Sequence, residues 1–326
     1  GLPHRLRHPR VPTRKPVNPM EETTTHPRRA RRARRRRRRS LLPLAILLAA
    51  LAIAVPVILS LLPRQPRVEP EPEDPHAGQV YVNDGANMVW LTPHKNLAVN
   101  PFTANDFTRD ENGVLRYTGM SGTVRLGVDV SDYQSGTDWQ QLARQGVDFA
   151  ILRVGYRGYT RGTLREDSSF RTFVRGARAA GIDVGAYFFS QAVTVQEAIM
   201  EADYVLGLLD GVPLDLPVYF DWEPVFADDS RTASFDASRL TNIAAAFCRV
   251  VEQGGCSAGI YLNRQQGYYQ YDLSRLADWS LWVADYNDYP DFYYAFDMWQ
   301  YSDSAALDGV PTQADLNFLF VPSPRG

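Results

Sequence analysis

The hydrophobic pattern from Val124 onward predicts strands that alternate with helices. Short apolar runs, typical of strands that are buried on both faces, are separated in the first half of this segment by stretches of helical pattern. We expect strands at 125–130, 149–154, 184–189, 217–223, 258–262, 280–283, 296–301 and 314–320. We expect helices at 139–145, 168–180, 195–209 and 237–253. This order predicts an α/β fold, a parallel-rich β/α barrel whose later helices are short or absent.

An apolar run without any charge, residues 41–62, precedes this alternating pattern. Its length fits the ~20 residues that a helix needs to cross a bilayer. Six consecutive arginines at 34–39 stand directly before it. A positive block before a single span predicts a cytoplasmic N-terminus and places the segment after the span outside the cell membrane. A cleaved signal peptide is the alternative, although its apolar region is usually shorter.

The formal net charge of −2 conceals two segments of opposite charge. Residues 1–40 carry 15 of the 35 Lys and Arg but only two of the 37 Asp and Glu, so the tail has a charge of +13 and the remaining chain −15. No stacking aromatics are interleaved with the arginines, so we expect no nucleic-acid partner. We therefore divide the chain into a basic cytoplasmic tail (1–40), a transmembrane helix (41–62), a Pro- and Glu-containing linker (63–79), a small β element (80–122) and the barrel (123–326).

Two acids at the end of the fourth expected strand give the clearest chemical signal. Asp221 and Glu223 are spaced i, i+2, so both side chains project toward the same face of the strand. Active sites of β/α barrels lie at the carboxyl ends of the strands. Neighbouring carboxyl groups there shift each other's pKa apart, which leaves one protonated acid beside one ionised partner. The pair is typical of a glycosidase, although two solvated acids after a strand would show the same short pattern.

Further acids are expected at the same end of the barrel. Asp129 ends the first expected strand and Asp315 lies in the last, so four carboxyl groups would surround one opening. Asp285 is an additional acid, for which we expect the role of a loop cap. No histidine follows His94, which excludes a His-based metal site and a Ser-His-Asp triad in the barrel. We expect neither a metal nor a cofactor.

Six motifs, in order, make residues 124–320 similar to the family 25 glycoside hydrolases, the lysozymes that cut peptidoglycan. The motifs are Gly127-Val-Asp-Val-Ser131, Arg153, Gly185-Ala-Tyr-Phe-Phe-Ser190, Asp221-Trp-Glu223, Leu281-Trp-Val-Ala-Asp-Tyr286, and Trp299-Gln-Tyr-Ser302 followed by Asp315-Leu-Asn317. The resemblance implies a flattened TIM-like barrel. It also implies hydrolysis of the β-1,4 bond between N-acetylmuramic acid and N-acetylglucosamine in peptidoglycan glycan strands.

The resemblance also implies a role for each acid. Glu223 would be the general acid that protonates the leaving oxygen. Asp221 would orient the N-acetyl group of the substrate or stabilise the developing oxocarbenium charge. Asp129 and Asp315 would complete the acidic cluster and help to set the pKa of Glu223. The nucleophile is left open between a protein carboxylate and the substrate acetamido group.

Several other residues of these motifs are candidates for substrate binding. The candidates for stacking on sugars are Tyr187, Trp282, Tyr286 and Trp299. Burial in the barrel core is an equal alternative for them, because large aromatics are commonly buried with a bonded polar tip. Arg153 is expected to support the acids, and Asn317 joins the binding candidates. Phe188 stands where many family members carry His, which implies a more apolar site.

The resulting prediction is a muramidase that is tethered to the membrane by one N-terminal helix. Two alternatives stay open: a catalytically weak barrel that binds or scaffolds peptidoglycan, and a glycosidase for another N-acetylated glycan such as chitin. The two cysteines, Cys248 and Cys256, are compatible with a disulfide outside the cell or with two separate thiols.

Overall fold

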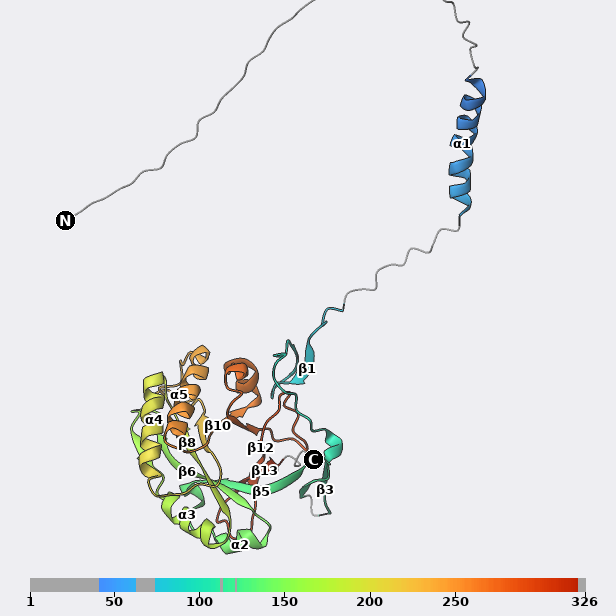
Figure 1. Ribbon diagram of the computed structural model, residues 1–326. Coiled ribbons are helices and arrows are strands. Elements are labelled where there is room, and N and C mark those ends of the chain that lie inside the picture. Colours follow the sequence, from blue (N-terminus) through green and yellow to red (C-terminus); the bar gives the residue numbers. More distant parts are fainter. Residues whose placement is uncertain (1–40, 63–73, 112–113, 121, 322–326) are drawn as a thin grey trace, which may run out of the picture. The chain divides into compact units, whose positions relative to one another are not determined.

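The computed structural model describes residues 41–62, 74–111, 114–120 and 122–321. The chain divides into two compact units between Glu71 and Pro72. The first contains helix α1, and the second contains every element that follows it (Figure 1). The predicted basic tail and residues 63–73 of the predicted linker lie outside the described residues.

Helix α1 (Leu42–Leu61) coincides with the uncharged apolar run. Pro43 occupies its first turn, where a missing N–H leaves no hydrogen bond unmade, and Pro56 lies inside it. None of its residues is buried. Among the described residues it is the one helix long and apolar enough to cross a membrane, a test that a signal sequence near an N-terminus also passes.

An α/β barrel forms the core of the second unit. Its eight strands are β5 (Thr123–Val130), β6 (Phe149–Arg157), β8 (Asp183–Ser190), β9 (Val218–Trp222), β10 (Ala258–Asn263), β11 (Ser280–Ala284), β12 (Met298–Ala305) and β13 (Ala314–Val321). Consecutive strands from β5 to β12 pair in parallel, and β13 lies antiparallel between β12 and β5. Since β5 also pairs with β6, the ring is closed. A short ninth strand, β7 (Leu164–Glu166), which the pattern did not predict, adds to β6.

The α-helices of the barrel all precede β10. They are α2 (Trp139–Arg144), α3 (Phe170–Ala179), α4 (Val195–Leu208) and α5 (Leu240–Gln253). Asp138 and Thr194 accept hydrogen bonds from the first turns of α2 and α4, which explains where these helices begin. Between β10 and β11 the chain forms only short turns, Gln266–Gln270 and Leu273–Arg275. The antiparallel connection from β12 to β13 needs no crossover helix.

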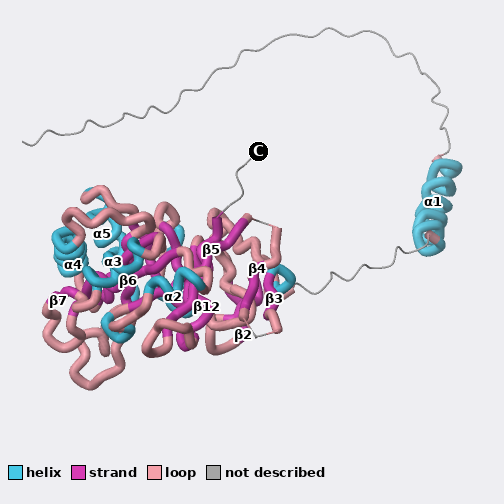
Figure 2. Tube along the Cα trace, turned by 90° about the horizontal axis from the view of Figure 1, so that it is seen from below, coloured by secondary structure: helices cyan, strands magenta, loops and turns pink. Residues whose placement is uncertain are grey.

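Residues 80–122 contain two hairpins, and both contact the barrel. These hairpins are β1 (Val80–Asn83) with β2 (Met88–Leu91) and β3 (Phe107–Arg109) with β4 (Leu115–Tyr117). Phe107 and Leu115 belong to the main hydrophobic core, and the Phe107 ring lies 5.2 Å from that of Trp299. The hairpin β3–β4 lies on the side of the barrel opposite α3, α4 and α5 (Figures 1 and 2).

The strands bury both faces in separate hydrophobic clusters. The larger cluster contains Phe220 and Trp222, which point outward from β9. A smaller cluster inside the barrel contains Tyr219 of the same strand and Trp282 of β11. This alternation directs Asp221 toward the barrel interior. Cys248 is buried, Cys256 is half-buried, and both are free thiols.

Candidate active site

Four acids meet at one end of the barrel. Asp129 lies near the carboxyl end of β5, Asp221 lies near the end of β9, and Glu223 follows that strand directly. Asp315 is the second residue of β13, whose antiparallel direction brings its first residues to the same rim. Asp129 and Asp315 are register partners. All four acids line one cavity of about 240 Å³, here called the acid cavity.

The crowding of these acids raises their affinity for protons. Burial raises the pKa of Asp129, Asp221, Glu223 and Asp315. The Asp129 charge adds to this effect at Glu223, while the charges of Glu223 and Asp129 add to it at Asp221. Burial and the Asp129 charge raise the pKa of Asp315 to about 9. Asp315 therefore keeps its proton near neutral pH, and the raised pKa of Glu223 favours the protonated form that a general acid requires.

Asp129 is the best hydrogen-bonded of the four acids. Its Oδ2 accepts hydrogen bonds from Gln300 Nε2 at 2.8 Å and from Asn317 Nδ2 at 2.8 Å. Both bonds favour the ionised carboxylate and oppose the effect of burial on its pKa. Asp221 contrasts with it, because the buried Oδ1 of Asp221 has no hydrogen-bond partner among the described residues.

Gln300 and Tyr261 are site residues that the sequence reasoning missed. The Gln300 amide donates to Asp129 and, at 3.3 Å, to Asp315, while its Oε1 accepts the hydroxyl hydrogens of Tyr261 and Tyr286. Gln300 belongs to the motif Trp299-Gln-Tyr-Ser302, but the sequence pattern alone indicates no role for it. Tyr261 is the inward-facing residue of β10, a position that strand alternation alone could have indicated.

A second cavity, of about 340 Å³, adjoins the acid cavity. Glu223 and Tyr261 line both cavities, so Glu223 lies at their junction. The second cavity is also lined by Asp84 and Gly85, from the turn of the β1–β2 hairpin, and by Asp285. Asp285 is buried, and its Oδ2 accepts a hydrogen bond from the Asp291 backbone N–H, as a loop cap would.

Residues 128–310 match the family model of glycosyl hydrolases family 25. The chain belongs to this family. Residues 128–310 are therefore a glycoside hydrolase domain, in agreement with the resemblance carried by the motifs of the chain.

Similar proteins extend this comparison. The chain is 24% identical over 193 residues to the autolytic lysozyme of Clostridium acetobutylicum, a match covering 59% of this chain and 54% of that protein. The uncharacterized protein YegX of Escherichia coli K12 is 26% identical over 194 residues, covering 59% and 68% of the two chains. The chain thus spans about half the length of the autolytic lysozyme.

Two solved structures share the fold. The spore cortex lytic enzyme SleM of Clostridium perfringens is 27% identical with a TM-score of 0.52, over 60% of this chain and 67% of that one. The modular autolysin LytC of Streptococcus pneumoniae is 20% identical with a TM-score of 0.56, over 69% and 52%. The barrel is thus an α/β barrel of the kind found in this family.

The aromatic candidates of this family 25 hydrolase separate into two groups. Tyr187 and Trp282 line the acid cavity, although Trp282 is almost fully buried, and Tyr286 is half-exposed at the second cavity. Trp299 is fully buried on the outer side of the barrel and lines neither cavity. Asn317 is also fully buried, where it bonds Asp129 instead of facing the cavity. The expected contacts of Trp299 and Asn317 with substrate are therefore not supported, because both side chains are covered.

Arg153 and Phe188 are two further residues that the sequence places near the acids. Arg153 lines the acid cavity, but it forms ion pairs with Asp132 and Asp167 rather than with any of the four acids. Burial and the charges of Glu223 and Asp129 raise the pKa of Asp221, and the positive charge of Arg153 only partly opposes this rise. The expectation that Phe188 makes the site more apolar was wrong. Phe188 points outward and packs against Phe247 of α5, because neighbouring residues of a strand face opposite sides.

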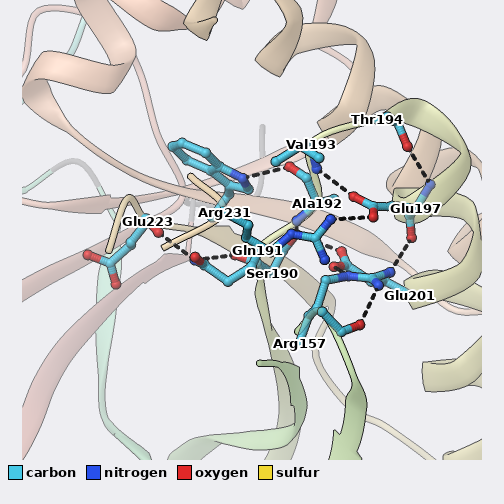
Figure 3. A network of polar contacts seen from close by, with 12 residues as sticks. Arg157, Ser190, Gln191, Ala192, Val193, Thr194, Glu197, Glu201, Glu223 and Arg231 are labelled. Atoms are coloured by element: carbon cyan, nitrogen blue, oxygen red, sulfur yellow. Dashed lines mark hydrogen bonds and ion pairs between the residues drawn. The ribbon is translucent and has the colours of Figure 1, made fainter. Parts of the chain in front are cut away.

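A polar network holds Glu223 and the preceding residue Trp222 in the hydrolase (Figure 3). Gln191 Nε2 donates to the backbone oxygen of Glu223 at 2.6 Å, and Trp222 Nε1 donates to that of Ala192 at 2.9 Å. Behind them, the buried Glu201 carboxylate accepts hydrogen bonds from Ser190 and Arg157. The backbone that carries Glu223 is thereby tied to the end of β8 and to α4.

The described residues contain no cluster of three or more His, Cys, Asp or Glu side chains that could hold a metal ion.

Proposed function

We propose that this glycoside hydrolase is a muramidase, which cleaves the β-1,4 bond between N-acetylmuramic acid and N-acetylglucosamine in peptidoglycan. The location of Glu223 at the junction of two cavities is the observation that carries the proposal. A glycan strand that occupies both cavities has one glycosidic bond beside this carboxyl group. The family, together with relatives named as an autolytic lysozyme, a spore cortex lytic enzyme and an autolysin, supports peptidoglycan as the substrate.

In this proposal Glu223 donates the proton and Asp221 faces the developing charge. Glu223 is partly exposed and opens into both cavities, whereas Asp221 is 5% exposed. Burial and the Asp129 charge raise the pKa of Glu223, which favours its protonated form. Glu223 gives this proton to the glycosidic oxygen as its bond to C1 breaks, and the carboxyl groups of Asp221 and Asp129 stabilise the positive charge that develops at C1. A water molecule finally supplies the hydroxyl group at C1, and its other proton returns to Glu223.

The neighbouring residues would hold the acids and the sugars. Gln300 and Asn317 orient Asp129, and we assign Asp315 to the same cluster. Tyr187 in the acid cavity and Tyr286 in the second cavity offer aromatic surfaces to the sugar rings. The site is then complete without a cofactor. Six parallel pairings, with α-helices only in the first half, support a flattened TIM-like barrel as its scaffold.

The apolar helix α1 suggests where the enzyme works. We propose that α1 spans the cell membrane once, with the basic tail in the cytoplasm and the barrel outside, where peptidoglycan lies. The unburied apolar residues of α1 and the arginines that precede them in the sequence support this arrangement.

Product analysis tests the proposed reaction. The full chain, purified in detergent, is incubated with isolated peptidoglycan and with chitin oligomers, and the products are identified by mass spectrometry after reduction. Newly formed reducing N-acetylmuramic acid ends are expected from peptidoglycan. Reducing N-acetylglucosamine ends would indicate another glycosidase specificity, and binding without any product would indicate a scaffolding barrel.

A further inference from the structure

A third cavity continues the acid cavity in the direction of the β6–β7 hairpin. It measures about 380 Å³ and shares Tyr133, Arg153 and Phe189 with the acid cavity. It shares no lining residue with the second cavity. The acid cavity therefore connects two further spaces, and a glycan bound at Glu223 lies next to both of them.

The charged side chains that line this third cavity are mainly positive, in contrast to the negative net charge of the chain after residue 40. Four of its lining residues are arginines, Arg153, Arg157, Arg161 and Arg165, and we call it the arginine cavity. Asp132 is the single acid among its described lining residues, and it is paired with Arg153. The sequence after residue 40 carries a net charge of −15, so this concentration of positive charge stands out from its surroundings.

Two of the four arginines are available to a ligand. Arg157 is buried and bonds Glu201, and Arg153 bonds Asp132 and Asp167. Arg161 and Arg165 are exposed, and neither forms a hydrogen bond or an ion pair through its side chain with any described residue. Both residues line the cavity, and their guanidinium groups have no partner among the described residues.

The β6–β7 hairpin that carries these arginines is firmly held. Strand β6 pairs with β7, and this pairing sets Arg165 opposite Tyr156, which also lines the cavity. Arg157 Nη1 donates to the backbone oxygen of Gly162 at 2.8 Å, which ties the turn to the buried pair with Glu201. The backbone positions of Arg161 and Arg165 are therefore set by the barrel.

Two unpaired guanidinium groups beside a sugar site indicate an anionic ligand. Guanidinium groups match carboxylates with two parallel hydrogen bonds, whereas an uncharged sugar does not need such a charge. We propose that the arginine cavity binds the carboxylates of the peptide stem that the muramic acid residue carries beside the cleaved bond. This inference rests on the proposed muramidase function. It makes the hydrolase selective for glycan strands that still carry their peptides.

The test compares two substrates and one double variant, using the full chain in detergent. The substrates are soluble glycan strands with intact peptide stems and the same strands after an amidase has removed the peptides. For R161Q/R165Q we expect KM on peptide-bearing strands to rise by about fivefold with kcat within about twofold, as for partly exposed charge pairs. KM on peptide-free strands should not change.

Two control variants separate the cavity from general charge. Arg175→Gln removes a positive charge from the exposed face of α3, outside the cavity, and should leave KM unchanged on both substrates. R161K/R165K keeps both charges but loses the paired hydrogen-bond geometry, so it should restore part of the affinity.

The results that would contradict the arginine-cavity proposal differ from those that would contradict the proposed function. Equal KM values for both substrates in the unmodified protein, or an equal loss for both in R161Q/R165Q, would overturn the arginine-cavity proposal. Cleavage of neither substrate would overturn the proposed function instead. Calorimetric titration with a soluble muramyl peptide would then still measure whether binding depends on Arg161 and Arg165, since it requires no turnover.

Discussion

At the scale of single residues, the chemistry of Glu223 depends on how β9 ends. Strand alternation points Tyr219 and Asp221 into the barrel, and Glu223 continues this face one step beyond the last strand residue, Trp222. Burial there raises the pKa of both acids. The greater exposure of Glu223 leaves it open to a substrate, while Asp221 lies deeper.

The first prediction concerns the proton donor. Glu223→Gln keeps the shape of the side chain but removes its acidic proton, so kcat on peptidoglycan should fall by at least ~100-fold. Binding of glycan strands should persist, because the amide still fits the junction of the two cavities. Turnover is measured by the release of reducing sugars, with circular dichroism as the control for folding. Near-normal turnover in a folded variant would remove Glu223 from the mechanism.

The second prediction concerns pH. Activity requires a protonated Glu223, so it falls as the pH rises through the pKa of this group. The charge of Asp129 raises that pKa, and Asp129→Asn should therefore shift the alkaline limb of the kcat/KM profile to lower pH. Asp203→Asn, on the exposed side of α4, is the matched control and should leave the limb in place. A limb that stays fixed in Asp129→Asn would show that Asp129 does not set the Glu223 pKa.

The residues of the candidate active site show which of its features the sequence predicts and which it does not. The motifs and the i, i+2 spacing were enough to bring Asp221 and Glu223 to one face, and the structure places Asp129 and Asp315 beside them. The direction of Trp299 could not be read, because barrel strands are apolar on both faces. Once Gln300 is known to face the acids, strand alternation requires Trp299 to face outward.

At the scale of secondary-structure elements, the connection between two strands of the barrel explains whether they run parallel or antiparallel. The parallel strands up to β10 are joined by segments that contain helices, as a crossover requires, and the sequence pattern predicted those helices within a few residues. The short connection from β12 to β13 gives an antiparallel pair, which places Asp315 at the active end of the barrel. The strand β7 escaped prediction because it has only three residues, without a clear alternating pattern.

The third prediction concerns the hairpin β3–β4. Phe107 is 6% exposed and packs against Trp299 and Tyr117, so the hairpin shares the hydrophobic core of the barrel. Phe107→Ala should lower the free energy of unfolding by about 3–5 kcal/mol, the usual cost of emptying a buried aromatic site. Urea denaturation followed by tryptophan fluorescence measures this change.

The matched control for this variant is Phe226→Ala. Phe226 is 92% exposed, and its removal should change the free energy of unfolding by no more than about 0.5 kcal/mol. If Phe107→Ala proves as harmless as this control, residues 80–122 are an appendage that the barrel does not need.

At the scale of the whole molecule, charge and hydropathy divide the chain into a basic tail, an apolar helix and an acidic remainder. Folding of the barrel does not require this division. The tail carries +13, α1 exposes its apolar side chains along its whole length, and the remainder carries −15. Water disfavours such an exposed helix, and a bilayer favours it. The sequence alone indicates this division, because a membrane span depends on local composition rather than on tertiary contacts.

The last prediction concerns topology. If α1 is an uncleaved anchor, protease added to cells stripped of their wall should degrade the barrel and spare a tag placed on the N-terminus, because the positive tail stays in the cytoplasm. Blotting for the tag and for a barrel epitope measures both fates, and lysed cells, in which both signals should disappear, are the control. A shortened soluble barrel as the main product would identify α1 as a signal peptide. Loss of the tag together with survival of the barrel would reverse the orientation and place the hydrolase on the side of the membrane without peptidoglycan.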